Sequence, residues 1–152
     1  MYKKILVPLD GSELAECTLS HVKNLFKEGF VGEVTLLNVV KVDIPWALMR
    51  SEYPQSIDLN AIREPLIAKS RKYLANIESR LVSEGVKVET LSLEGNRPAD
   101  TIIECAKGMD MIIIGTHGYT GLKKLMMGSV ASGVLNQSPI PVLLIRPESC
   151  QI

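Results

Sequence analysis

The chain has 152 residues, of which 46% are hydrophobic and 22% are charged, a composition typical of one soluble globular domain with a single sizeable core. Its 17 Lys and Arg residues balance 17 Asp and Glu residues, and zero net charge argues against broad nucleic-acid binding, which needs a basic face. No apolar run approaches the roughly 20 residues of a membrane span, and three cysteines without C-x-x-C spacing argue against a disulfide scaffold or a zinc site. We therefore expect a cytoplasmic protein that binds neither nucleic acid nor membranes.

The amino-terminal half of the chain alternates strand-like and helix-like patterns. Residues 4–9 are a short apolar run that predicts a strand, and Ser12 is a suitable N-cap for a helix that ends at Glu28-Gly29. Residues 34–40 are nearly all apolar, as expected of a strand covered on both faces. Residues 41–60 lack a clear period, and we expect a long loop there, either a lid or partner surface or an insertion without a role.

The carboxyl-terminal half continues this alternation. A helix is predicted over residues 61–84 and ends before Gly85, and Pro65 favours a start nearer Glu64. The elements that follow are an alternating strand expected near an edge, a helix that begins at proline, a buried strand, a short helix and a final apolar strand, at residues 86–93, 98–107, 111–114, 129–136 and 139–146.

This order of elements predicts the fold class. Strands that alternate with helices imply a parallel sheet with right-handed crossovers and helices on both faces. We expect an α/β protein with one open five-stranded sheet, Rossmann-like, with the strand order 3-2-1-4-5. A single domain is expected to cover residues 1–152.

A glycine-rich stretch links the strand at 111–114 to the helix that begins at Ser129. Glycines allow close approach of the backbone to a ligand, and a helix N-terminus offers unpaired N–H groups to an anion. Ligands in open parallel sheets bind beyond the carboxyl ends of the strands, where Asp10 would face this stretch if the first and fourth strands are neighbours. The stretch therefore predicts a site for the ribose and phosphates of a nucleotide, although neither a P-loop nor a G-x-G-x-x-G motif is present.

The glycine spacing also carries a resemblance to a known family. Gly115, two residues, Gly118, nine residues and Gly128-Ser129 resemble the ATP-binding motif of the universal stress protein family. The first strand with its turn and the last strand also resemble that family, at residues 4–12 and 139–145. The resemblance covers the chain apart from the long loop, and it implies membership of the branch that binds ATP.

The resemblance implies a set of nucleotide contacts. Asp10 would contact ribose hydroxyls or order a metal-bound water, Val39 would contact adenine through its backbone, and the last helix would begin at the phosphates. The positions carried over are Pro8, Leu9, Asp10, Val39, Ile114, Gly115, Thr116, His117, Gly118, Gly128, Ser129 and Val130. Mg²⁺ or Mn²⁺ is expected on the phosphates, because such ions take few protein ligands and use substrate oxygens.

Simpler interpretations stay open for several of these residues. Asp10 would also suit a cap of the first helix, and Gly115 and Gly118 would also suit turns. Ser129 would serve as a helix cap whether or not it binds phosphate. His117 is the residue that could order a water for hydrolysis, but a histidine in a loop is more often solvated.

Three functions follow from these alternatives. The leading hypothesis is a binding module that changes its surface or assembly with ATP occupancy, and the resemblance implies that it acts in a stress response. The second is a slow ATPase, for which the glycine loop provides no arginine and no carboxylate. The third is a structural or chaperone-like role that needs no nucleotide.

The last strand also predicts an assembly. It is strongly apolar and is expected at an edge of the sheet, where a bare strand is liable to aggregate unless it is paired. We expect a homodimer in which residues 140–146 of two chains pair antiparallel, an arrangement that the resemblance also implies. A further protein partner is expected at the loop over residues 41–60.

Overall fold

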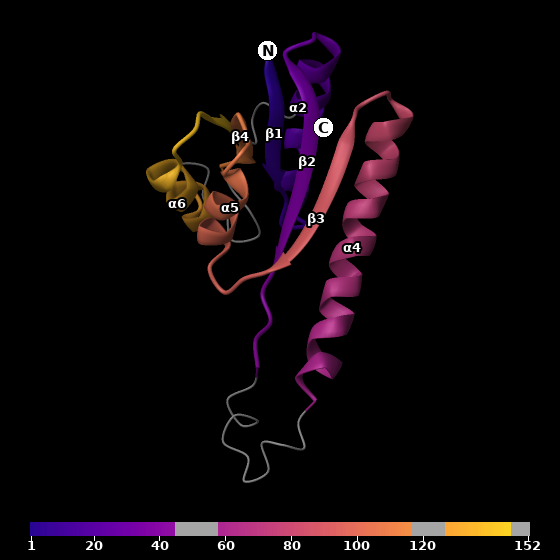
Figure 1. The fold of residues 1–152 in the computed structure, drawn as a ribbon, viewed down its shortest axis with the longest axis vertical. Coiled ribbons are helices and arrows are strands. Elements are labelled where there is room, and N and C mark those ends of the chain that lie inside the picture. The colour runs from indigo at the N-terminus through magenta and orange to yellow at the C-terminus, as the bar shows by residue number, and fades with distance from the viewer. Residues whose placement is uncertain (45–57, 117–126, 147–152) are drawn as a thin grey trace.

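The structure is a computed structural model in which residues 1–44, 58–116 and 127–146 are described (Figure 1). Within them five strands form one parallel sheet in the order β3-β2-β1-β4-β5, which confirms the predicted α/β fold and strand order. The strands are β1 (Tyr2–Pro8), β2 (Val31–Val40), β3 (Val88–Glu94), β4 (Met111–Gly115) and β5 (Val142–Ile145). The helices are α1 (Glu13–Glu16), α2 (Thr18–Lys27), α4 (Leu59–Ser83), α5 (Pro98–Ala106) and α6 (Ser129–Gln137).

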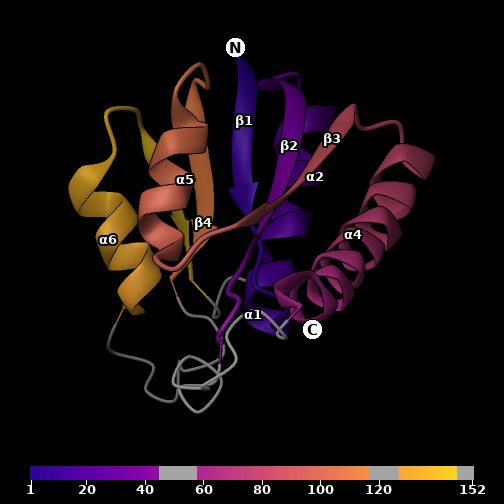
Figure 2. The same ribbon diagram turned by 60° about the horizontal axis from the view of Figure 1, so that its bottom comes forward.

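The side chains of the central strands alternate between two apolar cores. Ile5 and Val7 of β1 face the core under α2 and α4, whereas Leu6 between them faces the core under α5 and α6. The same alternation along β4 places Ile113 with the first core and Ile112 with the second. The sheet is therefore the middle layer, with α5 and α6 on one face and α1, α2 and α4 on the other (Figure 2).

The central strand β1 lies between β2 and β4. Pro8 pairs with Leu37 of β2, and Ile5 pairs with Met111 of β4. The chain order of the strands reverses between β1 and β4, so the crevice expected of an open parallel sheet lies beyond the carboxyl ends of these two strands. This arrangement confirms that the first and fourth strands are neighbours, the condition under which Asp10 was expected to face the glycine-rich stretch.

The predicted first helix is two helices, α1 and α2, separated at Cys17. Ser12 caps α1 as predicted, because its Oγ accepts a hydrogen bond of 3.0 Å from Ala15 N. The Thr18 hydroxyl donates to Ala15 O at 2.6 Å across this break. Cys17 is disulfide-bonded, which the cysteine pattern did not predict, whereas Cys105 has a free thiol.

Helix α4 begins at Leu59, so the predicted start near Glu64 is wrong. Asp58 caps it by accepting a hydrogen bond of 3.0 Å from Asn60 N, and Pro65 lies inside the helix. A buried stripe downstream holds the helix on the sheet, and this packing outweighs the single backbone bond that a proline removes. The end of the predicted long loop is therefore helical, and residues 45–57 lie outside the described part of the chain.

The two edge strands differ from their predicted lengths. β5 covers Val142–Ile145 and is shorter than the predicted 139–146, in which Pro139 and Pro141 provide no N–H donor. β3 is an edge strand, as its alternating pattern predicted. Among the described residues, no helix is both long and apolar enough to span a bilayer.

Candidate functional site

A cavity of about 300 Å³ lies beyond the carboxyl ends of β1, β2 and β4, where the strand order reverses. Ten of the twelve predicted site positions line it: Pro8, Leu9, Asp10, Val39, Ile114, Gly115, Thr116, Gly128, Ser129 and Val130. The other two predicted positions, His117 and Gly118, lie outside the described residues, and their roles stay predictions. The volume is at the lower end of the range usual for small-molecule sites.

The end of β1 presents a carboxylate to this cavity. Leu9 is buried, and its N donates to Leu37 O at 2.8 Å, which extends the pairing with β2 one residue beyond the strand. Asp10 follows and is exposed, and its Oδ1 accepts a hydrogen bond of 2.9 Å from Ser12 N. Gly11 between them has a φ of +86°, a conformation that favours glycine. The turn therefore orients the Asp10 carboxylate while Ser12 caps α1.

The end of β4 closes the cavity with buried backbone. Thr116 is 6% exposed, and its N donates to Ile145 O of β5 at 2.9 Å. Its carbonyl accepts a hydrogen bond of 2.7 Å from Gly128 N, immediately before α6. The two ends of the glycine-rich stretch therefore meet at this bond, although residues 117–126 between them are not described.

The N-terminus of α6 borders the same cavity. Gly128 is its N-cap residue and makes no side-chain capping hydrogen bond, and Ser129 at the first helical position is exposed. Gly128 has a φ of −62°, so its backbone conformation does not require glycine. A nine-residue helix presents its first N–H groups and the positive end of its dipole at this point. This end of the cavity is suited to an anion.

The opposite wall is apolar and comes from β2 and α5. Val39 lies on the α5 side of β2, together with Leu37 two residues earlier. Pro98 and Ile102 face them from the first turns of α5. Sequence reasoning selected Val39 from the resemblance but missed these neighbours and two alanines, so the positions it did not name are Ala15, Leu37, Pro98, Ile102 and Ala131. The two-residue period of a strand identifies Leu37, whereas the approach of α5 depends on tertiary packing.

The charge distribution of the site is simple. Asp10 is the one ionisable side chain among the described residues that line the cavity. In the same described part of the chain, no group of three or more His, Cys, Asp and Glu residues is arranged to hold a metal ion. The site thus combines an apolar slot, one carboxylate and a helix N-terminus.

Comparisons with known proteins agree with this geometry. The model of the Universal stress protein family matches residues 1–146. The chain is 37% identical to Universal stress protein MJ0577 of Methanocaldococcus jannaschii over 157 residues, which cover 96% of both chains. The solved structure of MJ0577 superposes with a TM-score of 0.78 over 95% of this chain and 96% of that one.

Two more distant solved structures contain nucleotides. A universal stress protein family protein of Arabidopsis thaliana with AMP bound has a TM-score of 0.64 at 20% identity, over 94% of this chain and 90% of that one. A universal stress protein in complex with cAMP has a TM-score of 0.61 at 20% identity, over 95% and 97%. At this identity the two structures establish a shared fold with this chain.

Proposed function

Because the chain belongs to the universal stress protein family, we propose that it binds one ATP per chain in the carboxyl-end cavity and acts as a nucleotide-dependent regulatory module. One observation carries the proposal: three chemically different walls meet at a single cavity, namely an apolar slot, the Asp10 carboxylate and the N-terminus of α6. These walls correspond in order to the base, the ribose and the phosphates of a nucleotide.

The apolar slot suits a purine base. Val39 and Pro98, which are half-buried, provide apolar contacts that an aromatic ring system prefers, and the buried Leu37 and Ile102 support them from behind. Asp10 stands beyond the slot, where its carboxylate would accept hydrogen bonds from ribose hydroxyls. Such charge-assisted bonds are stronger than neutral ones, so Asp10 would contribute to selectivity for a ribonucleotide.

The N-terminus of α6 suits the phosphates. The backbone N–H groups of its first turn, together with the Ser129 hydroxyl, are the donors that a phosphate accepts. Glycine at position 128 would let the phosphates approach the backbone closely. We propose that Mg²⁺ or Mn²⁺ enters with the phosphates, held by phosphate oxygens and water, with Asp10 available to order one of these waters.

Relatives support an adenine nucleotide as the ligand. The structures with AMP and cAMP bound contain ligands that share the adenine base and the ribose with ATP. Regulation requires that ATP and its alternative ligand favour different states of the protein, because a ligand with equal affinity for two states shifts neither. We propose that ATP and its alternative ligand differ in how many phosphates reach the N-terminus of α6, and that the two ligands favour different states of the protein for this reason.

Calorimetry tests the proposal directly. Protein stripped of nucleotide is titrated with ATP and Mg²⁺, and with AMP as the comparison. We expect the wild type to bind one ATP per chain. We expect Gly128→Val to lower the affinity for ATP at least about tenfold, because the valine side chain would block the approach of the phosphates to the N–H groups of α6. The φ of −62° at Gly128 is one that valine adopts, and thermal unfolding measures the stability that the change of the N-cap residue removes.

Gln137→Val at the other end of α6 is the matched control, since Gln137 is exposed and does not line the cavity. It should bind ATP as the wild type does. Folded wild-type protein that shows no saturable heat with ATP contradicts the proposed function.

We also propose a homodimer through β5. This strand is at the edge of the sheet, and Leu143 is 37% exposed there. Antiparallel pairing of two β5 strands would cover apolar surface and provide hydrogen-bond partners for the backbone groups of the edge strand. Sedimentation should detect the dimer, and a monomer at micromolar concentration contradicts it. The partner surface expected over residues 41–60 stays a prediction, because residues 45–57 lie outside the described chain.

A further inference from the structure

A polar network lies behind the site, on the face of the sheet that α4 covers. It joins Asn38 of β2, Ser70 of α4 and Ser92 of β3, and it ends on the carbonyl oxygen of Leu9. We infer that Asn38 is a positioning residue of the nucleotide site, which holds the Leu9–Asp10 segment in place while Ser70 and Ser92 fix the orientation of its amide. The inference rests on the proposed function, since it names a residue that acts on the same site without touching the ligand.

Leu9 is held to β2 at both of its backbone groups. Its N donates to Leu37 O at 2.8 Å, and its O accepts a hydrogen bond of 2.7 Å from Asn38 Nδ2. The second bond fixes the plane of the peptide that joins Leu9 to Asp10. Because the Asp10 side chain is attached to the Cα atom at which this peptide plane ends, rotation of the peptide would move the carboxylate away from the cavity.

The network has a defined direction. A carbonyl oxygen can only accept, so Asn38 must present its NH₂ group to Leu9 and its Oδ1 to the opposite side. There Ser70 Oγ lies 2.7 Å from Asn38 Oδ1 and 2.7 Å from Ser92 Oγ. A hydroxyl has one proton, so Ser70 donates to Asn38 and accepts from Ser92. Both serines therefore hold the amide in the orientation that Leu9 requires.

Burial makes the arrangement specific. Ser70 is 5% exposed, and Ser92 pairs with Asn38 in the register of β2 and β3. Asn38 and Ser92 are half-buried. A flipped Asn38 amide would place its NH₂ group against the buried Ser70 hydroxyl and its oxygen against the Leu9 carbonyl, so both of its hydrogen bonds would weaken. The network is also remote from the ligand, because it lies on the α4 side of β2, whereas Val39 faces the cavity.

A double-mutant cycle on ATP affinity tests the inference. Asn38→Asp keeps the shape of the side chain but replaces the donor with an oxygen that faces Leu9 O. We expect this change to lower the affinity for ATP about tenfold, in line with the loss of one well-placed hydrogen bond. In an Asp10→Ala background the same change should weaken ATP by less than about threefold, because the group that it positions is then absent.

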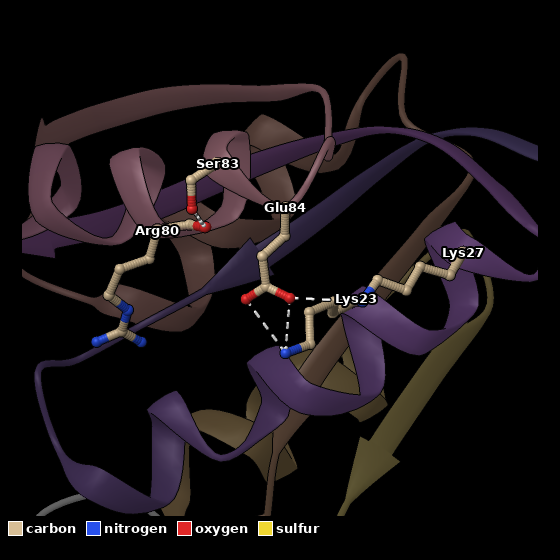
Figure 3. A network of polar contacts seen from close by, with 5 residues as sticks. All are labelled: Lys23, Lys27, Arg80, Ser83 and Glu84. Carbon is tan, nitrogen blue, oxygen red and sulfur yellow. Dashed lines mark hydrogen bonds and ion pairs between the residues drawn. The ribbon is translucent and has the colours of Figure 1, made fainter.

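A second pair of variants keeps the test decisive if Asn38→Asp does not fold. Ser92→Thr retains the hydroxyl, whereas Ser92→Val introduces a side chain of the same shape as threonine but without the hydroxyl. Both residues are favourable in a strand, so the two variants differ only in this hydrogen-bond donor. ATP should bind more weakly to Ser92→Val than to Ser92→Thr. Ser83→Ala, which removes a hydroxyl that donates to Arg80 O at the far end of α4, is the control and should bind ATP as the wild type does (Figure 3).

The outcomes separate the two proposals. Additive effects of Asn38→Asp and Asp10→Ala, or equal affinities of the two Ser92 variants, overturn the positioning role while ATP binding by the wild type stands. A wild type that does not bind ATP overturns the proposed function and the positioning role together.

Discussion

The two ends of the parallel sheet differ in how their polar groups are satisfied. At the carboxyl end, the Asp10 carboxylate and the first N–H groups of α6 border a cavity. At the amino end, charged side chains pair with one another across elements: Glu84 after α4 contacts Lys23 and Lys27 of α2 at 3.0 and 3.5 Å (Figure 3). The amino-end ion pairs join two helices. The carboxyl end also has an ion pair, between Arg63 of α4 and Glu94 of β3 at 2.7 Å, and what distinguishes this end is the cavity.

This difference indicates which substitutions should separate binding from stability. Changes to the exposed side chains that line the carboxyl-end cavity, such as Ser129, should alter nucleotide affinity more than stability, because these side chains contribute little to the packed cores. Changes at the amino end should alter stability and leave affinity intact, because the residues that line the cavity lie at the carboxyl ends of the strands. The three predictions below test that division, from the largest expected effect to the smallest.

Ser129→Asp should separate the two properties most clearly. A carboxylate in the first turn of α6 interacts favourably with the helix dipole, so the melting temperature should be unchanged or slightly higher. The same charge would repel phosphates, and we expect ATP affinity to fall about a hundredfold. Calorimetry and thermal unfolding measure the two effects on one preparation.

Asn60→Asp is the control for this substitution. It introduces the same charge into the first turn of α4, at an exposed position that does not line the cavity. It should leave ATP affinity unchanged. Retained affinity in Ser129→Asp contradicts phosphate binding at α6, and so does an equal loss in both variants.

Gly85→Ala should reduce stability without affecting ATP. Gly85 follows α4 at the amino end with a φ of +88°, and an added Cβ meets nothing within 4 Å, so its cost is conformational. We expect the free energy of unfolding to fall by about 1 kcal/mol, measured by urea denaturation. Ser83→Ala is a nearby exposed substitution without that strain and should cost less. A tenfold loss of ATP affinity in Gly85→Ala would show that the two ends are coupled.

The sequence pattern predicted most of the strands and helices that define the two ends of the sheet. Apolar runs and helical periods located every described strand and most helices, because burial of one face or both leaves a period in the sequence. The glycine-rich stretch and the helix start that follows it predicted where the candidate cavity lies, at the carboxyl ends of the strands. Ten of the twelve predicted positions accordingly surround one cavity, although their roles as nucleotide contacts stay predictions.

What the sequence could not predict depends on partners that are distant along the chain. Ser70 is 32 residues from Asn38 and 22 from Ser92, and no periodicity joins them. The start of α4 was misplaced because Pro65 suggested a boundary, while the packing downstream tolerates it.

Glu84→Gln should have the smallest effect, and it should depend on pH. The hydrogen bond from Lys23, together with the charges of Lys23 and Lys27, holds the pKa of Glu84 below its ordinary value of 4.5. A carboxyl whose pKa is lowered by folding stabilises the protein above its unfolded-state pKa and loses that contribution as the pH falls through the folded-state pKa. The wild type should therefore be slightly more stable than Glu84→Gln at neutral pH, and the two should converge in acid below pH 4.5.

Thermal unfolding at a series of pH values measures this convergence. Both partners are well exposed, with 31% of the Lys23 and 39% of the Glu84 side chain accessible, so added salt should also reduce the difference between the two proteins. Glu28→Gln is the control, because no described cation forms an ion pair with Glu28, and it should show no such convergence. A difference for Glu84→Gln that persists at low pH would mean that its carboxylate charge is not what links α2 to the end of α4. ATP affinity at neutral pH should be the same in all three proteins, because this ion pair stands at the opposite end of the strands from the cavity.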